Sequence, residues 1–245
     1  LMIGFMQGRL TESKNGKIQF FPWNNWENEF QVAYDNSFEL IEWTIDIENI
    51  DNNPIYKQQE KILDLKKKYN IEISSVTCDF LMEAPYYKDD QITNIDINKS
   101  HTFLNHTIKA CNDLSIKYII FPLVDEGKIE NEYQKQKLIR SLNSNNNLLN
   151  SSCEILFETD FNPIKQKDFM HNFSSEKFGI NYDTGNSASL GFSVEEEFQY
   201  YYNYIKNIHI KDRKKSLPTT KLGNGDFNFK YFFDYLTENK YDKNL

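Results

Sequence analysis

The sequence has no stretch that would cross a membrane as a helix. Such a helix needs about 20 consecutive apolar residues, whereas the best apolar run here extends only from Tyr118 to Val124 and contains Pro122. The first residues also lack the succession of basic, apolar and small residues that marks a cleaved signal peptide. We therefore expect a soluble, cytoplasmic protein with no membrane partner.

Positive charge is also scarce. The chain carries 28 lysines and arginines against 36 aspartates and glutamates, a net charge of −8. Binding to nucleic-acid phosphates requires a positive surface, so the composition argues against a nucleic-acid partner. One basic run, from Lys211 to Lys215, is the exception. It is either a binding place for a small anion or an ordinary solvated loop.

Cysteine is rare, with Cys78, Cys111 and Cys153 as the three copies. An odd number without zinc-type spacing predicts neither a disulfide framework nor a cysteine-based metal site. We expect all three to be reduced and buried. Cys78, which precedes Asp79 at an expected strand end, is also a candidate for lining a site.

Strand-like and helix-like segments alternate along the chain, which is typical of a parallel sheet with crossover helices. The expected strands are 2–6, 38–45, 71–76, 116–124, 154–158, 179–182 and 207–210. The expected helices are 26–34, 54–69, 96–114, 130–149, 194–205 and 231–239. No domain boundary is visible, so residues 1–245 are expected to form one domain.

Seven strands are compatible with an open doubly wound sheet or with a (β/α)₈ TIM barrel whose eighth strand is missing. A doubly wound sheet concentrates its site at one switch point, whereas here polar candidates follow nearly every strand. Gly223 and Gly225 lack the third glycine, and the preceding strand, of a nucleotide-binding fingerprint. We therefore predict an α/β fold of the TIM-barrel class, incomplete at its C-terminus.

Three candidate metal ligands stand at or near the ends of successive expected strands. They are Glu158, Asp183 and His209, and in a barrel these strand ends share one rim. One imidazole with two carboxylates suits Mn²⁺, Mg²⁺, Co²⁺ or Zn²⁺, so the set predicts one divalent metal ion without naming it. Each residue also has a structural alternative: a lysine ion pair for Glu158, a turn for Asp183 and a hydrogen-bonded core position for His209.

Arginine is as scarce as cysteine, with Arg9, Arg140 and Arg213 in a lysine-rich chain. A guanidinium binds carboxylates or phosphates in a bidentate manner. Arg9 follows the first strand, after Gln7, and Arg213 follows the seventh, so both are expected at one mouth as substrate ligands or as a structural ion pair. Glu42, isolated in an apolar strand, is either a substrate contact or part of a buried ion pair.

Six stretches carry a resemblance to a known family. They are residues 4–10, 41–43, 157–158, 181–186, 207–213 and 222–226. Taken in this order they resemble the xylose isomerase-like TIM-barrel superfamily of sugar phosphate isomerases and epimerases, a fold shared with AP endonuclease family 2. The opening Met-Gln-Gly-Arg-Leu is similar to a bacterial branch associated with surface-sugar biosynthesis.

The resemblance implies one metal ion held by a glutamate, an aspartate, a histidine and a second glutamate on the eighth barrel strand. Glu158, Asp183 and His209 match the first three, and the fourth has no counterpart in this sequence. Many epimerases of the family carry a substrate-binding histidine three residues after the aspartate, where this chain has Asn186. In the family, the two glutamates move protons on opposite faces of the substrate, which implies an acid and base role for Glu158.

The resulting hypothesis is a metal-dependent isomerase or epimerase of a small sugar or sugar phosphate, acting by proton transfer next to a carbonyl through an enediolate. Glu158 is the expected catalytic residue. The expected substrate contacts are Gln7, Arg9, Glu42, Asn186, Lys211 and Arg213. The alternatives are a polyol or keto-acid dehydratase of the same fold and an inactive sugar-binding relative. A nuclease of the superfamily is disfavoured because it needs many histidines, and a homo-oligomer is left open.

Overall fold

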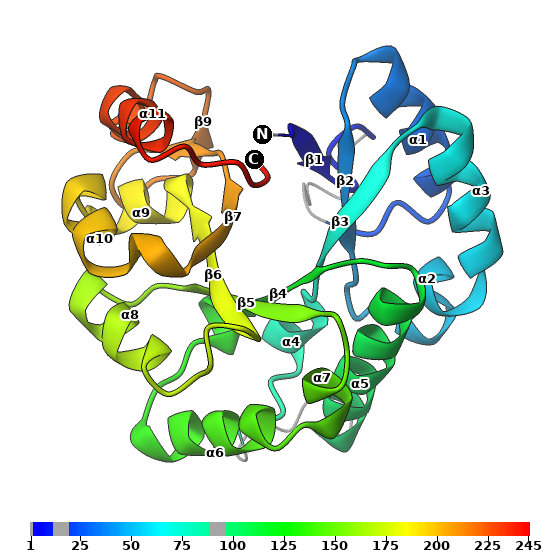
Figure 1. Cartoon of the computed structure of the whole chain (residues 1–245), viewed down its shortest axis with the longest axis horizontal. Helices are drawn as coiled ribbons and strands as arrows, with labels where there is room; N and C mark the ends of the chain where they lie inside the picture. Colours follow the sequence, from blue (N-terminus) through cyan, green and yellow to red (C-terminus); the bar gives the residue numbers. More distant parts are fainter. Residues whose placement is uncertain (1, 12–19, 89–96) are drawn as a thin grey trace. The chain divides into compact units, whose positions relative to one another are not determined.

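The computed structural model describes residues 2–11, 20–88 and 97–245 (Figure 1). The chain divides into two compact units, Ile3–Ile155 and Leu156–Leu245, the second of which also includes Met2. We refer to them as the N-terminal and the C-terminal unit. The single domain expected over residues 1–245 stays a prediction.

The N-terminal unit contains four parallel strands that pair in chain order. They are β1 (Gly4–Met6), β2 (Leu40–Thr44), β3 (Glu72–Thr77) and β4 (Tyr118–Leu123). The helices are α1 (Trp26–Asp35), α2 (Pro54–Lys57), α3 (Gln59–Tyr69), α4 (Phe80–Glu83), α5 (Ile97–Asp113), α6 (Glu132–Asn143) and α7 (Asn146–Leu149), with short 3₁₀ turns η1 (Ile50–Asn52) and η2 (Asp125–Gly127). Every residue of β2 and β4 is buried, as expected for parallel strands covered on both faces.

Two predicted helices of this unit are each divided in two. The predicted helix 54–69 is interrupted at Gln58, whose φ of −135° lies outside the helical range. The predicted helix 130–149 ends at Asn143, because Asn145 has an extended backbone and its side chain accepts a hydrogen bond from the Leu148 N–H. An asparagine in this arrangement starts a new helix rather than continuing the old one.

The C-terminal unit contains most of β5 (Glu154–Thr159), together with β6 (Phe178–Asp183) and β7 (Ile205–His209). Strands β6 and β7 are parallel, with Asn181 opposite Asn207 and Asp183 opposite His209. The helices are α8 (Pro163–Met170), α9 (Thr184–Leu190), α10 (Val194–Tyr201) and α11 (Phe229–Glu238), with the 3₁₀ turn η3 (Tyr202–Tyr204). A short antiparallel ribbon, β8 (Asp212–Arg213) and β9 (Thr219–Thr220), follows β7.

Helices α8 and α9 were not predicted from the sequence. The start of α8 carries a recognisable signal, since Asn162 caps the helix and Pro163 occupies its first turn. Helix α9 begins directly after β6, where Asp183 is its capping residue. The turn considered as the structural alternative for Asp183 is therefore the first turn of a helix.

The last residues of the chain begin strand pairing beside β7. Asn244 forms isolated parallel bridges with Asn207 and with Met2, and the Leu245 N–H donates to the Met2 carbonyl over 3.0 Å. This is the place at which the sequence predicts the eighth barrel strand. In the described part of the chain, the pairing at this place is limited to these two bridges.

The expectations for cysteines and for membrane helices can also be compared with the structure. Cys78, Cys111 and Cys153 are buried and free of disulfides, as predicted. Burial raises the pKa of the Cys78 thiol well above its ordinary value, which argues against a reactive role. No helix among the described residues is long and apolar enough to cross a membrane.

Candidate metal centre

Glu158, Asp183 and His209 lie together in the C-terminal unit. They occupy the carboxyl ends of β5, β6 and β7, and each offers one ligand atom within 4.8 Å of those of the other two. His209 Nδ1 is 3.3 Å from Glu158 Oε2 and 3.9 Å from Asp183 Oδ2. The strand register accounts for the approach of Asp183 to His209, because these two residues are paired across β6 and β7.

The donor set of this trio fits a divalent cation. Two carboxylates and one imidazole are ligands that Zn²⁺, Mn²⁺ and Co²⁺ accept. The side chains of Asp183, His209 and Glu158 are 1%, 11% and 12% exposed, and two buried carboxylates side by side are costly without positive charge nearby. Within the described ranges, no other group of three or more histidine, cysteine and acidic side chains approaches this closely.

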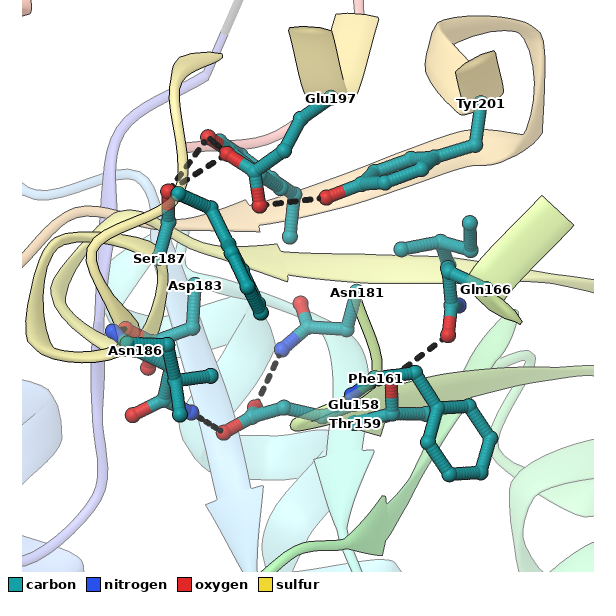
Figure 2. Close-up of a pocket in the computed structure, with 14 residues that line it drawn as sticks. Glu158, Thr159, Phe161, Gln166, Asn181, Asp183, Asn186, Ser187, Glu197 and Tyr201 are labelled. Carbon is teal, nitrogen blue, oxygen red and sulfur yellow. Dashed lines mark hydrogen bonds between the residues drawn. The ribbon is translucent and has the colours of Figure 1, made fainter. Parts of the chain in front are cut away.

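Both oxygens of Glu158 accept hydrogen bonds from carboxamides. Asn181 Nδ2 donates to Oε2 over 2.7 Å, and Asn186 Nδ2 donates to Oε1 over 2.8 Å (Figure 2). Burial raises the pKa of Glu158, but hydrogen bonding to His209 and the charges of His209 and Lys211 outweigh burial, so the pKa lies below its ordinary value. Glu158 is therefore held in its charged form, which is the form that binds metal ions.

The two carboxylate oxygens of Asp183 have different partners. Its Oδ1 accepts a hydrogen bond of 2.9 Å from the Asn186 N–H and so caps α9. Its Oδ2 forms an ion pair of 2.7 Å with Lys211 Nζ. The turn and ligand interpretations of Asp183 are therefore compatible, because one oxygen fixes the helix while the other faces His209 and Lys211.

Asn186 and Arg213 lie next to the trio. Arg213 Nη1 donates to Asn186 Oδ1 over 3.4 Å, and Arg213 Nε donates to the Leu217 carbonyl over 2.9 Å. Because Asn186 also donates to Glu158, a chain of two hydrogen bonds connects the guanidinium with the candidate ligand. Substrate contacts by Asn186, Lys211 and Arg213 stay predictions.

A small cavity of about 20 Å³ borders Glu158, Asn181 and Asn186 (Figure 2). A volume of this order accepts about one water molecule and is too small for a sugar. Glu197 on α10 also lines the cavity, so the cavity extends from Glu158 and Asp183 to α10.

Glu197 is buried and accepts hydrogen bonds from three hydroxyl groups. Tyr182 donates over 2.6 Å, Ser187 over 2.5 Å and Tyr201 over 2.7 Å. Burial raises the pKa of Glu197, although these three hydrogen bonds lower it in part. The cluster joins β6, α9 and α10, because one hydroxyl comes from each of these elements.

Gln7, Arg9 and Glu42 belong to the N-terminal unit. Gln7 is fully buried after β1, and its Oε1 accepts a hydrogen bond of 3.2 Å from the Thr44 N–H. Glu42 is buried in β2 and accepts a hydrogen bond of 2.7 Å from Ser75 Oγ. Arg9 lies half-buried in the turn after β1. Their participation in a substrate site stays a prediction.

The buried polar residues that sequence reasoning missed include Asn181, Asn207, Glu197 and Glu29. A signal for the two asparagines was present, because each stands in an apolar strand two positions before a candidate ligand and so shares its face. Glu197 and Glu29 gave no such signal. Each lies in a helix with other acidic residues, and the burial of one among them depends on tertiary packing.

The fold and the site agree with one family. The sequence model of the xylose isomerase-like TIM barrel matches residues 30–245. The chain belongs to this family, and the predicted α/β barrel fold class is thereby confirmed. No curated protein sequence matches the chain.

Solved structures share this fold at low sequence identity. An IolI protein with a bound zinc atom has a TM-score of 0.74 at 15% identity, over 100% of this chain and 87% of its own. L-ribulose 3-epimerase gives 0.70 at 18% identity, over 100% and 80% of the two chains. The probable 3-DHS dehydratase AsbF from Bacillus anthracis gives 0.68 at 14% identity, over 100% and 92%. The structural neighbours thus include sugar epimerases and a dehydratase.

Proposed function

We propose that this protein is a divalent-metal-dependent isomerase or epimerase of a small sugar or sugar phosphate. The observation that carries the proposal is the trio Glu158, Asp183 and His209, whose ligand atoms lie within 4.8 Å of one another at three successive strand ends. Enzymes with TIM barrels have their active sites at this end of the strands. The epimerases among the structural neighbours support this choice of reaction.

Glu158, Asp183 and His209 are the residues that would hold the metal ion. When bound, such an ion supplies positive charge that polarises a carbonyl or hydroxyl group of the substrate. The zinc atom of the IolI neighbour supports a divalent ion here. Asn181 and Asn186 keep the Glu158 carboxylate in place from two directions.

Glu158 is proposed to move the proton. Its lowered pKa leaves the carboxylate unprotonated near neutral pH, so that it can act as a base. The carboxylate takes the proton from the carbon next to the substrate carbonyl and returns it to the neighbouring carbon in an isomerisation. In an epimerisation, a proton has to reach the same carbon from the opposite face, which requires a second acid in addition to Glu158.

Lys211 and Arg213 are proposed to bind hydroxyl or phosphate oxygens of the substrate. Both side chains are cationic and lie beside the trio, Lys211 through its ion pair with Asp183 and Arg213 through its hydrogen bond to Asn186. An anionic group on the substrate would gain charge-assisted hydrogen bonds from them. Asn186 adds an amide at the same edge.

Exchange of the substrate proton with solvent tests the proposal. Ketoses and ketose phosphates are incubated in D₂O with the protein and Mn²⁺, and deuterium next to the carbonyl is measured by NMR. We expect exchange with the wild-type protein and a loss of at least about 100-fold in Glu158→Gln, because the base is removed. Glu154→Gln, at the start of the same strand, is the matched control and should retain exchange. Exchange retained in Glu158→Gln would refute the assignment.

Dehydration is the second candidate reaction, favoured by the fold similarity to the probable dehydratase AsbF. Product mass separates the two, because dehydration removes one water and isomerisation conserves mass. Elemental analysis of protein purified without chelator addresses the remaining alternative, since an inactive sugar-binding relative without a metal site would contain none.

A further inference from the structure

We propose that Asp212 is a positioning residue that directs the side chains of Lys211 and Arg213 toward the candidate metal centre. The inference rests on the proposed function, because these are the two cations assigned there to the substrate. It is carried by the backbone hydrogen bonds that the buried Asp212 carboxylate accepts, and by the opposite direction in which its two neighbours project.

The Asp212 carboxylate fixes a loop that we call the glycine loop, residues 221–227. Its Oδ2 accepts hydrogen bonds from the Gly223 N–H over 2.9 Å and from the Gly225 N–H over 2.8 Å. Its Oδ1 accepts a longer one of 3.5 Å from the Phe227 N–H. Asp212 is 1% exposed, and burial of a carboxylate is costly unless such donors compensate it. The carboxylate therefore connects β8 with backbone that lies 11 to 15 residues further along the chain.

Glycine at position 225 allows the loop to approach this carboxylate. A Cβ atom on Gly225 would overlap Asp212 Oδ1 and would lie 2.6 Å from the Arg213 carbonyl oxygen. A further hydrogen bond joins the loop to β8, because the Asp226 N–H donates to the Arg213 carbonyl over 3.0 Å. This close packing of β8 on the glycine loop therefore needs both the carboxylate of Asp212 and the absence of a side chain at Gly225.

The two neighbours of Asp212 project away from the glycine loop. Successive side chains of an extended chain point to opposite faces, so a carboxylate directed at the loop leaves Lys211 and Arg213 directed to the other side. In agreement with this alternation, Lys211 Nζ is 2.7 Å from Asp183 Oδ2. Arg213 Nη1 donates to Asn186 Oδ1 over 3.4 Å. The anchored Asp212 thus determines the side to which both cations point.

The Arg213 guanidinium is prepared for an anionic group. Its Nε–H donates to the Leu217 carbonyl over 2.9 Å, in the segment that connects β8 with β9. A guanidinium has five N–H groups, and the described residues accept hydrogen bonds from two of them. The remaining N–H groups suit a phosphate, which a guanidinium binds in a bidentate manner. Through Arg213, the anchor at Asp212 therefore favours a substrate that carries an anionic group.

NMR of the arginine side chains tests the positioning role without a substrate. The chain contains three arginines, so in ¹⁵N-arginine-labelled protein the Arg213 Nε–H signal is assigned by its loss in Arg213→Lys. We expect this proton to exchange slowly with water, because it donates to the Leu217 carbonyl. In Asp212→Ala, and in Gly225→Ala from the other side of the contact, exchange should be at least about 10-fold faster. Asp234→Ala, which removes an exposed carboxylate from α11, should leave the exchange rate unchanged.

Calorimetric titration with inorganic phosphate separates the positioning role from an effect of charge. Removal of a carboxylate next to two cations strengthens anion binding if charge alone is involved. A positioning role predicts the opposite sign. We expect phosphate affinity about 10-fold weaker in Asp212→Ala than in the wild type, because a mobile guanidinium loses more conformational freedom on binding. Asp212→Asn, which keeps one acceptor oxygen, should lie between the two.

Two results would overturn the inference: a wild-type exchange rate of the Arg213 Nε–H in a folded Asp212→Ala variant, or an unchanged or increased phosphate affinity in that variant. If Asp212→Ala does not fold, as judged by circular dichroism, Asp212→Asn and Gly225→Ala decide by the same two measurements. If the wild-type protein does not bind phosphate, the anionic substrate group is excluded, while the exchange rates still decide the positioning role. Neither measurement involves turnover, so a lack of substrate proton exchange in D₂O would refute the proposed reaction alone.

Discussion

Glu29, on α1, is a carboxyl group whose ionisation destabilises the folded protein. It is fully buried, accepts a hydrogen bond of 2.8 Å from the Gly8 N–H, and burial raises its pKa to about 7. Between pH 4.5 and 7, the unfolded chain releases this proton while the folded protein retains it. The stability contribution is therefore fully present below about pH 4.5 and is lost as the pH rises through about 7.

Glu29→Gln should remove this pH dependence. We expect the free energy of unfolding of the variant, relative to the wild type, to increase by about 3 kcal/mol between pH 4.5 and 8. Urea unfolding at a series of pH values measures the difference. Glu27→Gln, an exposed position on the same helix, should follow the wild-type profile. A constant difference between Glu29→Gln and wild type over this range would contradict the prediction.

Helix α10 is attached to β6 and α9 through Glu197. Glu197→Leu would leave the hydroxyl groups of Tyr182, Ser187 and Tyr201 without this acceptor. Each buried hydroxyl that loses its partner costs about 1–3 kcal/mol, so we expect a loss of about 3 kcal/mol or more in the free energy of unfolding. Urea unfolding measures it. Glu196→Leu, on the exposed side of α10, should change stability by less than about 0.5 kcal/mol, and equal effects of the two substitutions would exclude the anchoring role.

The elements that were predicted correctly are those with a strong local pattern. Strands β2, β4 and β6 are short, mostly apolar segments that lead into polar residues, which is visible in the sequence. The division of the helix at Asn145 depends on a single side-chain cap, and the start of α9 depends on Asp183 acting as a cap and a candidate ligand at once. Both are local competitions between a side chain and the backbone that periodicity does not resolve.

The candidate site could also be predicted only in part from the sequence. The placement of Glu158, Asp183 and His209 at strand ends could be expected from the alternation of strands and helices. The hydrogen bonds of Asn181 and Asn207 depend on the register of β6 against β7, and register is set by packing of the whole sheet. The burial of Glu197 likewise depends on how α10 packs on its neighbours. The sequence of a single helix does not specify this packing.

For the whole molecule, metal binding should raise thermal stability. An ion that binds the folded chain alone stabilises it by about 2.7 kcal/mol at a free concentration 100 times the dissociation constant. For a chain of this length, this corresponds to an increase of about 5–10 °C in Tm. Differential scanning fluorimetry with Mn²⁺ or Zn²⁺ measures the shift. His209→Gln, which removes one of the three candidate ligands, should lose it, and an equal shift in this variant would place metal binding elsewhere.

The two-residue spacing between each asparagine and the candidate ligand after it constrains how such a site can change during evolution. One inserted or deleted residue between Asn181 and Asp183 would turn one of them to the opposite face of the strand. The asparagine and the ligand therefore have to be inherited together, on both strands. A relative with the same arrangement has to combine Asn-x-Asp at the end of its sixth strand with Asn-x-His at the end of its seventh. This double motif offers a criterion for sorting the family into members that carry such an asparagine pair beside the candidate ligands and members that do not.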